Sequence, residues 1–186
     1  MKKSVRANGF TLLELMVALV VVSILLTVGL PSFSASVRQN CTITAANTLL
    51  TVLTAARSEA LKRDRNVGVC KSSNGTACAT GDAVTWDIGY LIYVDADGDR
   101  EKDAGEPVIR TELPLSACAT ITGAGNFVNK ITYSGLGKAS SNSNFLVIAN
   151  DSTSYRRRVV ISPSGRPRVC NPDKVTSTGI EPCGDT

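Results

Sequence analysis

The sequence predicts an α+β fold, in which one long amino-terminal helix packs on a small antiparallel β domain. An apolar run near the amino terminus passes into a helical pattern that extends to about residue 65. Residues 66–186 contain short apolar runs separated by Gly, Asn, Asp, Ser and Pro, a composition typical of strands and turns. At 186 residues and 43% hydrophobic content, the chain can form one modest globular domain besides the helix.

The helix is predicted over residues 10–65, in two parts. Residues 10–30 carry one charge, Glu14, and are long enough to cross a hydrocarbon core of about 30 Å, so we expect a transmembrane and assembly segment. Residues 31–65 are expected to be amphipathic, and Pro31 is expected to kink the helix. The apolar residues of this second part recur mostly every three or four positions: Ala46, Leu49, Leu50, Leu53, Ala56, Ala60 and Leu61.

The β head is predicted over residues 66–186, because no helical period reappears there. The turn residues between the apolar runs favour antiparallel pairing. The predicted strands are Val67 to Cys70, Gly89 to Val94, Pro107 to Glu112, Lys130 to Tyr133, Asn144 to Ala149, Arg158 to Ser162 and Pro167 to Cys170.

The six cysteines predict disulfides in an oxidising compartment, because their number is even and no CxxC pair suggests zinc or redox chemistry. Six cysteines allow fifteen connectivities, and the sequence alone does not choose among them. Two pairs would close short loops and leave a third by elimination, so we favour Cys70 with Cys78, Cys170 with Cys183 and Cys41 with Cys118.

The composition argues against an enzyme. The chain has no histidine, which removes the commonest general base and the commonest zinc ligand. Its net charge of +4 includes three positive charges ahead of residue 10, so losing that segment would leave +1. Overall basicity is therefore no argument for a nucleic-acid partner, although a local patch could be one.

Glu14 distinguishes between three interpretations of the amino terminus. A secretory signal peptide is suggested by the small residues Ser34-Ala35-Ser36, but the apolar run is longer than such peptides have. An ordinary membrane anchor leaves a buried carboxylate unexplained, at a cost of about 2.5 kcal/mol or more. If the chain is cut between Gly9 and Phe10, the carboxylate of one subunit can instead neutralise the new amino group of its neighbour.

The segment Gly9-Phe10-Thr11-Leu12-Leu13-Glu14 resembles the class III signal of type IV pilins and type II secretion pseudopilins. The resemblance implies that residues 1–9 are a leader, and that a prepilin peptidase cuts after Gly9 and methylates the amine of Phe10. It also implies a single-pass inner-membrane protein with its head in the periplasm, which later joins other pilins or pseudopilins in a filament. The fold it implies is the pilin fold.

The window Asp95–Glu106 is close to a calcium loop, because acidic residues occupy its first, third, fifth, seventh, ninth and twelfth positions. It departs from that motif at Gly98, which takes the fourth position, while Arg100 takes the sixth, where the glycine belongs. Strands rather than helices flank it, so the alternative is a polar hairpin loop. The candidate Ca²⁺ ligands are Asp95, Asp97, Asp99, Glu101 and Glu106, and no other cofactor is expected.

Five arginines and no acid lie between Tyr155 and Cys170. If the last two predicted strands form a hairpin, the side chains of Arg166 and Arg168 face the same way and suit phosphate oxygens. Arg156, Arg157 and Arg158 open the preceding strand and lie at the other end of the hairpin, so their place in one patch stays open. The alternative is a solvated turn whose arginines pair with acids on a neighbouring subunit.

Together, the amino-terminal helix, the Asp-rich hairpin and the motif Gly165-Arg166-Pro167-Arg168 resemble the GspH/FimT family of minor pilins and pseudopilins, and its FimT branch most closely. The resemblance implies a minor type IV pilin in which Gly165, Arg166 and Arg168 bind DNA during uptake in natural transformation. We expect such binding to be directed at the backbone and independent of sequence. The alternative is a GspH-type minor pseudopilin of a type II secretion system.

Overall fold

The computed structural model describes residues 10–173 and Cys183, apart from the side chains of residues 26 and 28–32. One helix, α1 (Leu12–Arg63), opens this part of the chain, so the predicted helix is confirmed with each end two residues shorter. The backbone stays helical through Pro31, and the predicted kink there remains a prediction. The chain divides into two compact units, Met1–Val37 and Arg38–Thr186, of which the second is called the head unit below.

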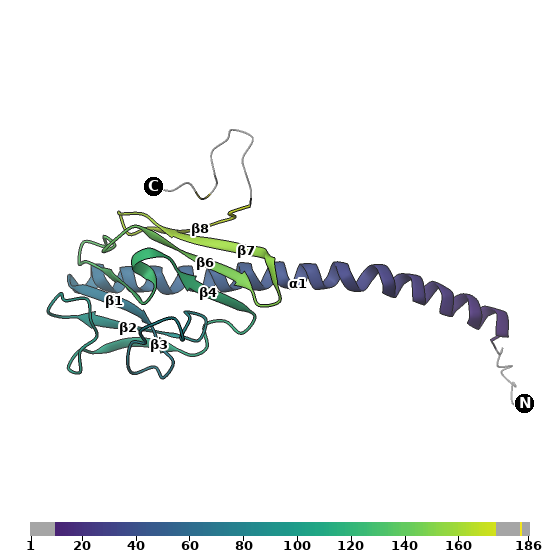
Figure 1. The fold of residues 1–186 in the computed structure, drawn as a ribbon, viewed down its shortest axis with the longest axis horizontal. Helices are drawn as coiled ribbons and strands as arrows, with labels where there is room; N and C mark the ends of the chain where they lie inside the picture. The colour runs from purple at the N-terminus through teal and green to yellow at the C-terminus, as the bar shows by residue number, and fades with distance from the viewer. Residues whose placement is uncertain (1–9, 174–182, 184–186) are drawn as a thin grey trace, which may run out of the picture. The chain divides into compact units, whose positions relative to one another are not determined.

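The head unit contains two four-stranded antiparallel sheets (Figure 1). The first sheet has the order β3-β2-β1-β5 and the second the order β4-β6-β7-β8. The strands are β1 (Asn66–Lys71), β2 (Tyr90–Asp95), β3 (Val108–Glu112), β4 (Ala119–Gly123), β5 (Lys130–Tyr133), β6 (Ser143–Ala149), β7 (Ser152–Ile161) and β8 (Pro167–Cys170), with one 3-10 turn, η1 (Gly125–Phe127).

All seven predicted strands are present, and the all-antiparallel pairing is confirmed for the described residues. Two differences are informative. The sequence prediction missed β4, whose stretch Ala-Thr-Ile-Thr-Gly offers only Ile121 as a large apolar residue. The strand β7 begins at Ser152 rather than Arg158, because its polar first half pairs with β6 through register positions such as Ile148 with Arg156.

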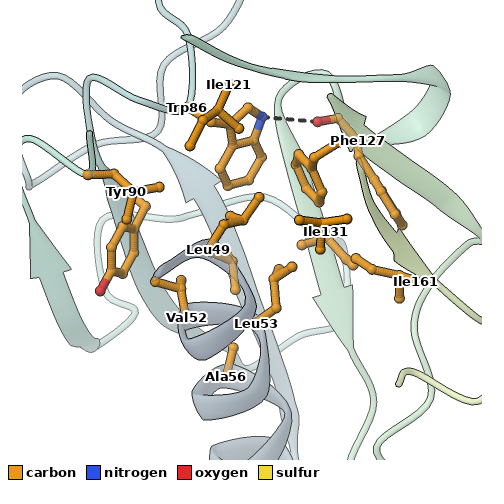
Figure 2. Packing of buried hydrophobic residues seen from close by; sticks show 14 of the residues in the cluster. Leu49, Val52, Leu53, Ala56, Trp86, Tyr90, Ile121, Phe127, Ile131 and Ile161 are labelled. Carbon is orange, nitrogen blue, oxygen red and sulfur yellow. Dashed lines mark hydrogen bonds between the residues drawn. The ribbon is translucent and has the colours of Figure 1, made fainter. Parts of the chain in front are cut away.

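The carboxyl-terminal part of α1 packs its apolar face against both sheets (Figure 2). Leu49 and Leu53 have no exposed surface and lie in one cluster with Ile121 and Ile131 from the two sheets and Phe127 from η1. Removing this area from water is the main stabilising contribution to the head unit. Of the predicted apolar residues, Ala46, Leu49, Leu53, Ala56 and Ala60 are fully buried.

Two members of the predicted apolar face were placed wrongly. Leu50 is only half-buried, and Leu61 is 50% exposed. Both follow a buried residue by one position, which rotates the side chain by about 100° around the helix axis and away from the sheets.

Trp86 completes the core from the loop between β1 and β2. Its ring lies edge-on to Phe145 at 5.0 Å between centroids, and its indole nitrogen donates to the carbonyl oxygen of Phe127 at 3.1 Å. The backbone nitrogen of Trp86 also donates to the carbonyl oxygen of Ile121, which fixes the loop to β4. The bulky ring is therefore both fully buried and hydrogen-bonded.

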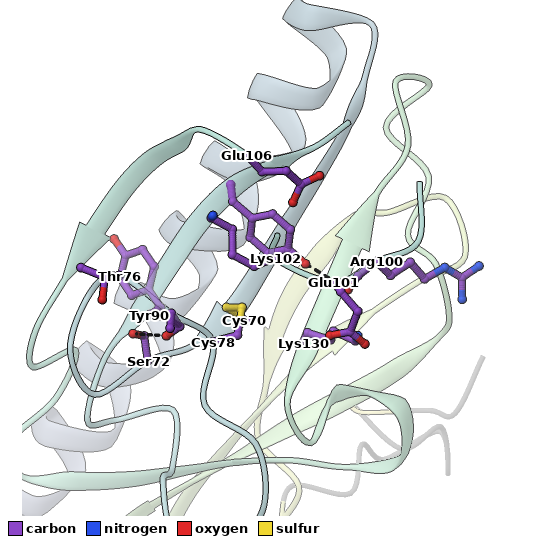
Figure 3. The surroundings of a disulfide bond; sticks show 12 residues. Cys70, Ser72, Thr76, Cys78, Tyr90, Arg100, Glu101, Lys102, Glu106 and Lys130 are labelled. Atoms are coloured by element: carbon purple, nitrogen blue, oxygen red, sulfur yellow. Dashed lines mark hydrogen bonds and ion pairs between the residues drawn. A yellow bond between two sulfur atoms is a disulfide. The ribbon is translucent and has the colours of Figure 1, made fainter. Parts of the chain in front are cut away.

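A smaller cluster covers the opposite face of the first sheet, where Cys70, Leu91 and Tyr93 are buried, and Figure 3 shows Cys70 there with its disulfide partner Cys78. Gly68 is required beneath it, because a side chain there would collide with the Tyr93 ring. The disulfide from Cys70 to Cys78 closes the cluster. All three predicted disulfides are confirmed: Cys41–Cys118, Cys70–Cys78 and Cys170–Cys183.

Candidate functional site

Thr11 caps the helix at its amino terminus. Its hydroxyl oxygen accepts a hydrogen bond from the backbone nitrogen of Glu14 at 3.2 Å. Thr-Leu-Leu-Glu is therefore a capping-box sequence, and the carboxylate of Glu14 lies where the helix dipole favours an anion. Phe10 directly precedes this cap and is 82% exposed, while Gly9 lies outside the described residues.

The first part of α1 has no apolar partner within the described chain. Its large apolar side chains are exposed by about half or more: Leu12, Leu13, Leu15, Met16, Val17, Leu19, Val20, Val21, Val22, Ile24 and Leu25. A continuous apolar surface of this length is expected to be covered by a partner or by lipid. Over the residues described, no helix combines the length and mean hydropathy required of a membrane span.

The predicted arginine hairpin is present as β7 and β8. Arg168 lies opposite Val160, and Pro167 lies opposite Ile161, whose side chain is in the core. The side chain of Arg168 is therefore on the outer face of the second sheet, and Arg166, two residues earlier in the chain, has the same parity. Both arginines are exposed. The register places Arg168 alone, because Arg166 lies one residue before β8, so the common orientation of the two side chains stays a prediction.

The hairpin turn is held in place by Gly165 and by Arg57 of α1, a residue that the sequence did not mark as functional. Gly165 has φ +79, and a side chain there would collide with the carbonyl oxygen of Gly137 in a neighbouring turn. Arg57 of α1 joins the two turns, because it donates to the carbonyl oxygens of Gly137 at 2.9 Å and Ser164 at 3.1 Å. Glycine in the motif is therefore explained by conformation and close contact.

The arginines that open β7 divide between the two faces of the second sheet. Arg157 lies opposite Val147 on the core side, whereas Arg156 and Arg158 lie on the outer side with Arg168. Arg158 lies opposite Cys170, two residues from Arg168, so the two arginines are diagonal neighbours whose Cα atoms are about 7 to 8 Å apart. The open question about one patch is thus answered in part: Arg158 shares the face of Arg168, and Arg157 does not.

Arg156 is already paired. It donates two hydrogen bonds to the Asp173 carboxylate from Nε and one from the guanidinium terminus. These bonds hold the pKa of Asp173 below its usual value and raise the pKa of Arg156. Asp173 was missed by the sequence analysis, and its position three residues after Cys170 was the available signal. The surface that we call the arginine face consists of Arg158 and Arg168 on the outer side of the second sheet, with Arg166 directly before β8.

The acidic loop joins β2 to β3 and brings three of its five candidate ligands together. Asp95, Asp97 and Asp99 each offer a carboxylate oxygen, and these oxygens lie within 4.8 Å of one another. Asp95 is 1% exposed, and its Oδ2 has no hydrogen-bond partner among the described residues. Its burial raises the pKa of this carboxyl above 3.8.

The remaining two candidate ligands are occupied elsewhere. Glu101 forms an ion pair with Lys130 of β5 (Figure 3). The two oxygens of Glu106 accept hydrogen bonds from the backbone nitrogens of Ala96 at 2.6 Å and Asp103 at 3.0 Å, so this side chain closes the loop.

The loop backbone has a left-handed residue at its sixth position, although the sequence places no glycine there. Gly98 has φ +84 and Arg100 has φ +70. Arg100, at the sixth position, thus takes the left-handed conformation for which a calcium loop uses glycine. Tyr93 supports it by donating its hydroxyl to the carbonyl oxygen of Arg100 at 3.0 Å.

Comparison with known protein families gives two matches. Residues 45–165 match the family model of the type II transport protein GspH. Residues 5–30 match the prokaryotic N-terminal methylation motif. The second match contains the whole segment on which the predicted cleavage and assembly residues lie.

Three individual proteins are similar to this chain in sequence or in structure. The pilin-like protein PilA1 of Thermus thermophilus is 29% identical over 168 residues, which cover 87% of this chain and 97% of that protein. The crystal structure of the type IV minor pilin FimU of Pseudomonas aeruginosa has the same fold, with a TM-score of 0.57 at 23% identity, covering 74% of this chain and 94% of that one. The minor pseudopilin EpsH of the Vibrio cholerae type 2 secretion system aligns at a TM-score of 0.49 and 12% identity, covering 72% of this chain and 99% of that one.

Proposed function

Because the chain belongs to the family of the type II transport protein GspH, we propose that it is a minor pilin of a type IV pilus. It is made as an inner-membrane precursor with its head unit in the periplasm. A prepilin peptidase cuts it between Gly9 and Phe10, and the mature chain joins other pilins. The observation that carries this proposal is the methylation motif over residues 5–30, followed by a helix whose apolar side chains are exposed.

Glu14 is proposed to act in assembly. It is the only charge among residues 10–30, so in a bilayer or a filament core its carboxylate requires a cationic partner. The amino group of a neighbouring subunit's Phe10 provides one, and opposite charges attract strongly where water is excluded. Their pairing would set the axial stagger between subunits.

The test of this role is Glu14→Gln, which keeps the shape of the side chain and removes its charge. We expect the variant to be cleaved and to remain in the membrane fraction while its share of the sheared filament fraction falls. Glu59→Gln, at the carboxyl end of α1, is the control and should assemble normally. Equal incorporation of Glu14→Gln and wild type would contradict the role.

The arginine face is proposed to bind DNA without sequence preference. Arg166, directly before β8, and Arg168 within it are exposed and about 7 Å apart along the chain, and half-buried Arg158 lies on the same face as Arg168. Guanidinium groups form paired hydrogen bonds with phosphate oxygens. Arg57 and Gly165 fix the turn before binding, which reduces the entropy lost when DNA is bound.

Salt dependence tests this proposal more sharply than affinity alone. Anisotropy titrations of a labelled duplex at several salt concentrations give the slope of log affinity against log salt. Removing two phosphate contacts with Arg166→Ala and Arg168→Ala should flatten this slope by about 2. The matched control is Lys62→Ala with Arg63→Ala, which removes the same charge from α1 and should leave the slope unchanged.

Two results of that titration would be decisive against DNA binding. One is a slope that does not change in the double variant. The other is an equal change in the control pair, which would show that any two positive charges suffice.

A subunit of a type II secretion pseudopilus is the second candidate, favoured by the description of the matched family as a transport protein. The two candidates differ in the filament that they enter. Immunolabelling of sheared surface pili, with a secretion assay on a deletion strain, separates them. A labelled pilus with normal secretion supports the first candidate, and a secretion defect without labelled pili supports the second.

A further inference from the structure

We propose that the loop between β2 and β3 binds a divalent cation, Ca²⁺, through the carboxylates of Asp95, Asp97 and Asp99. This acidic trio belongs to the head unit and is independent of both the cleavage site and the arginine face. The inference rests on three observations: the spacing of the carboxylate oxygens, the buried oxygen of Asp95 without a partner, and the absence of a neutralising side chain.

The spacing fits one ion. Oxygen ligands lie about 2.4 Å from Ca²⁺, so two ligands of the same ion are at most about 4.8 Å apart. One oxygen from each aspartate meets this limit with respect to the other two. The trio can therefore coordinate a single cation without moving the backbone.

Asp95 is the observation that points to a ligand. Its Oδ1 accepts the backbone nitrogen of Gly98 at 2.8 Å, whereas its Oδ2 is buried and has no partner among the described residues. Burying a carboxylate without a compensating partner is costly, and a bound cation would remove that cost. Its position as the last residue of β2 fixes this carboxylate at the base of the loop.

The protein itself does not neutralise the trio. In the part of the chain that the structure describes, no Lys or Arg nitrogen lies within the 4.0 Å of an ion pair from these three aspartates. Two of the nearby cations are engaged otherwise: Lys130 pairs with Glu101, and Lys102 donates to the backbone oxygen of Asp103.

The donor set selects Ca²⁺ over other divalent ions. The trio offers only carboxylate oxygens, the chain has no histidine, and all six cysteines are in disulfides, which disfavours zinc and copper. Ca²⁺ accepts six to eight oxygens in flexible geometry, so three carboxylates can be completed by backbone oxygens and water. Mg²⁺ requires a stricter octahedron and gives up its water reluctantly, so it should bind more weakly.

The inference narrows the set of ligands given by the sequence. Glu101 and Glu106 are left out, because among the described residues only the three aspartates bring their carboxylate oxygens within 4.8 Å of one another, and Glu101 forms an ion pair. Two other loop residues, Arg100 and Gly98, provide the left-handed backbone conformations around which the aspartates converge.

The test uses the full chain purified in detergent and treated with EDTA, then titrated with CaCl₂ by calorimetry and by thermal unfolding. We expect saturable binding of one Ca²⁺, with a dissociation constant of about 10⁻⁴ to 10⁻³ M, and a rise in melting temperature of the head unit. MgCl₂ should give a smaller rise, and NaCl at equal ionic strength none.

Asp97→Asn and Asp99→Asn are the diagnostic variants, because both residues are exposed and their removal should leave the fold intact. Each should weaken Ca²⁺ binding by about tenfold or more, since affinity depends on the number of charged ligands. Asp103→Asn, in the same loop but outside the trio, is the matched control and should bind like wild type. The inference would be overturned if the wild type showed no saturable binding at Ca²⁺ concentrations up to ten times the expected dissociation constant. Equal Ca²⁺ binding by the wild type and all variants would overturn it as well.

Discussion

The disulfide from Cys41 to Cys118 should contribute more to stability than the other two, because it closes the longest loop. It joins α1 to the segment before β4 across a sequence separation of 77 residues. The loop-closure relation gives about 4.5 kcal/mol for that length. The Cys70–Cys78 disulfide, with a separation of 8, gives about 2.5 kcal/mol. The expected difference from loop length alone is about 2 kcal/mol.

Burial modifies this difference. Cys41 is 9% exposed and Cys118 is exposed, so alanine at both positions removes less buried sulfur than alanine at Cys70, which is fully buried, and Cys78, which is half-buried. Cys70 is fully buried, and losing its sulfur adds about 1 kcal/mol to the cost of breaking the short disulfide. The Cys41→Ala, Cys118→Ala variant should therefore be less stable than the Cys70→Ala, Cys78→Ala variant by about 1 kcal/mol.

Urea unfolding of the head unit, followed by fluorescence of the buried Trp86, measures both free energies. Equal costs for the two double variants, or a larger cost for the short loop, would refute the loop-length reasoning. A change in the denaturant slope would instead indicate that the unfolded state had become more expanded, which is the expected accompaniment of losing the long cross-link.

Two further predictions concern the hairpin that carries the arginine face. Gly165→Ala should destabilise the head unit by at least about 1 to 2 kcal/mol in urea unfolding, because φ +79 is unfavourable for alanine and the new side chain would collide with Gly137. The control is Gly105→Ala, which is in open space without a positive φ, and equal effects of the two variants would contradict the explanation. Asp173→Ala should reduce stability fully above the unfolded pKa of the carboxyl, near 3.8, because the ion pair lowers the folded pKa and its stabilising contribution is lost as pH falls through that folded pKa. A stability advantage of the wild type that persists well below this pH would count against the ion pair with Arg156.

Much of the fold could be predicted because it depends on local patterns. The helical repeat through Leu49 and Leu53 identified the buried face of α1, and turn residues separated seven of the eight strands. The division into two sheets could not be predicted, since a period of two defines the faces of a strand but not its neighbours. The strand β4 was missed because Ile121 alone marked it, and its burial depends on Trp86 from a distant loop.

The candidate sites were also predictable only where they depend on local patterns in the sequence. The hairpin of β7 and β8 that carries Arg168 follows from turn residues and alternation along the chain, so it could be predicted. The positions of Arg57, Asp173 and Asp95 depend on contacts between separate segments of the chain, so local patterns could not identify the partners of these side chains. The structure pairs Arg156 with Asp173, and it reduces the five candidate Ca²⁺ ligands to the three aspartates of the acidic trio.

The most direct test of the proposed function is the amino terminus of the protein made in cells that contain a prepilin peptidase. Mass spectrometry of the purified chain and of its amino-terminal peptide identifies the first residue and any added methyl group. We predict a chain that begins at Phe10 and carries one methyl group on its α-amine, with residues 1–9 removed. A mature chain that retains Gly9, or one cut after Ser36 as a secretory signal peptide would be, contradicts the assignment of this protein as a processed pilin.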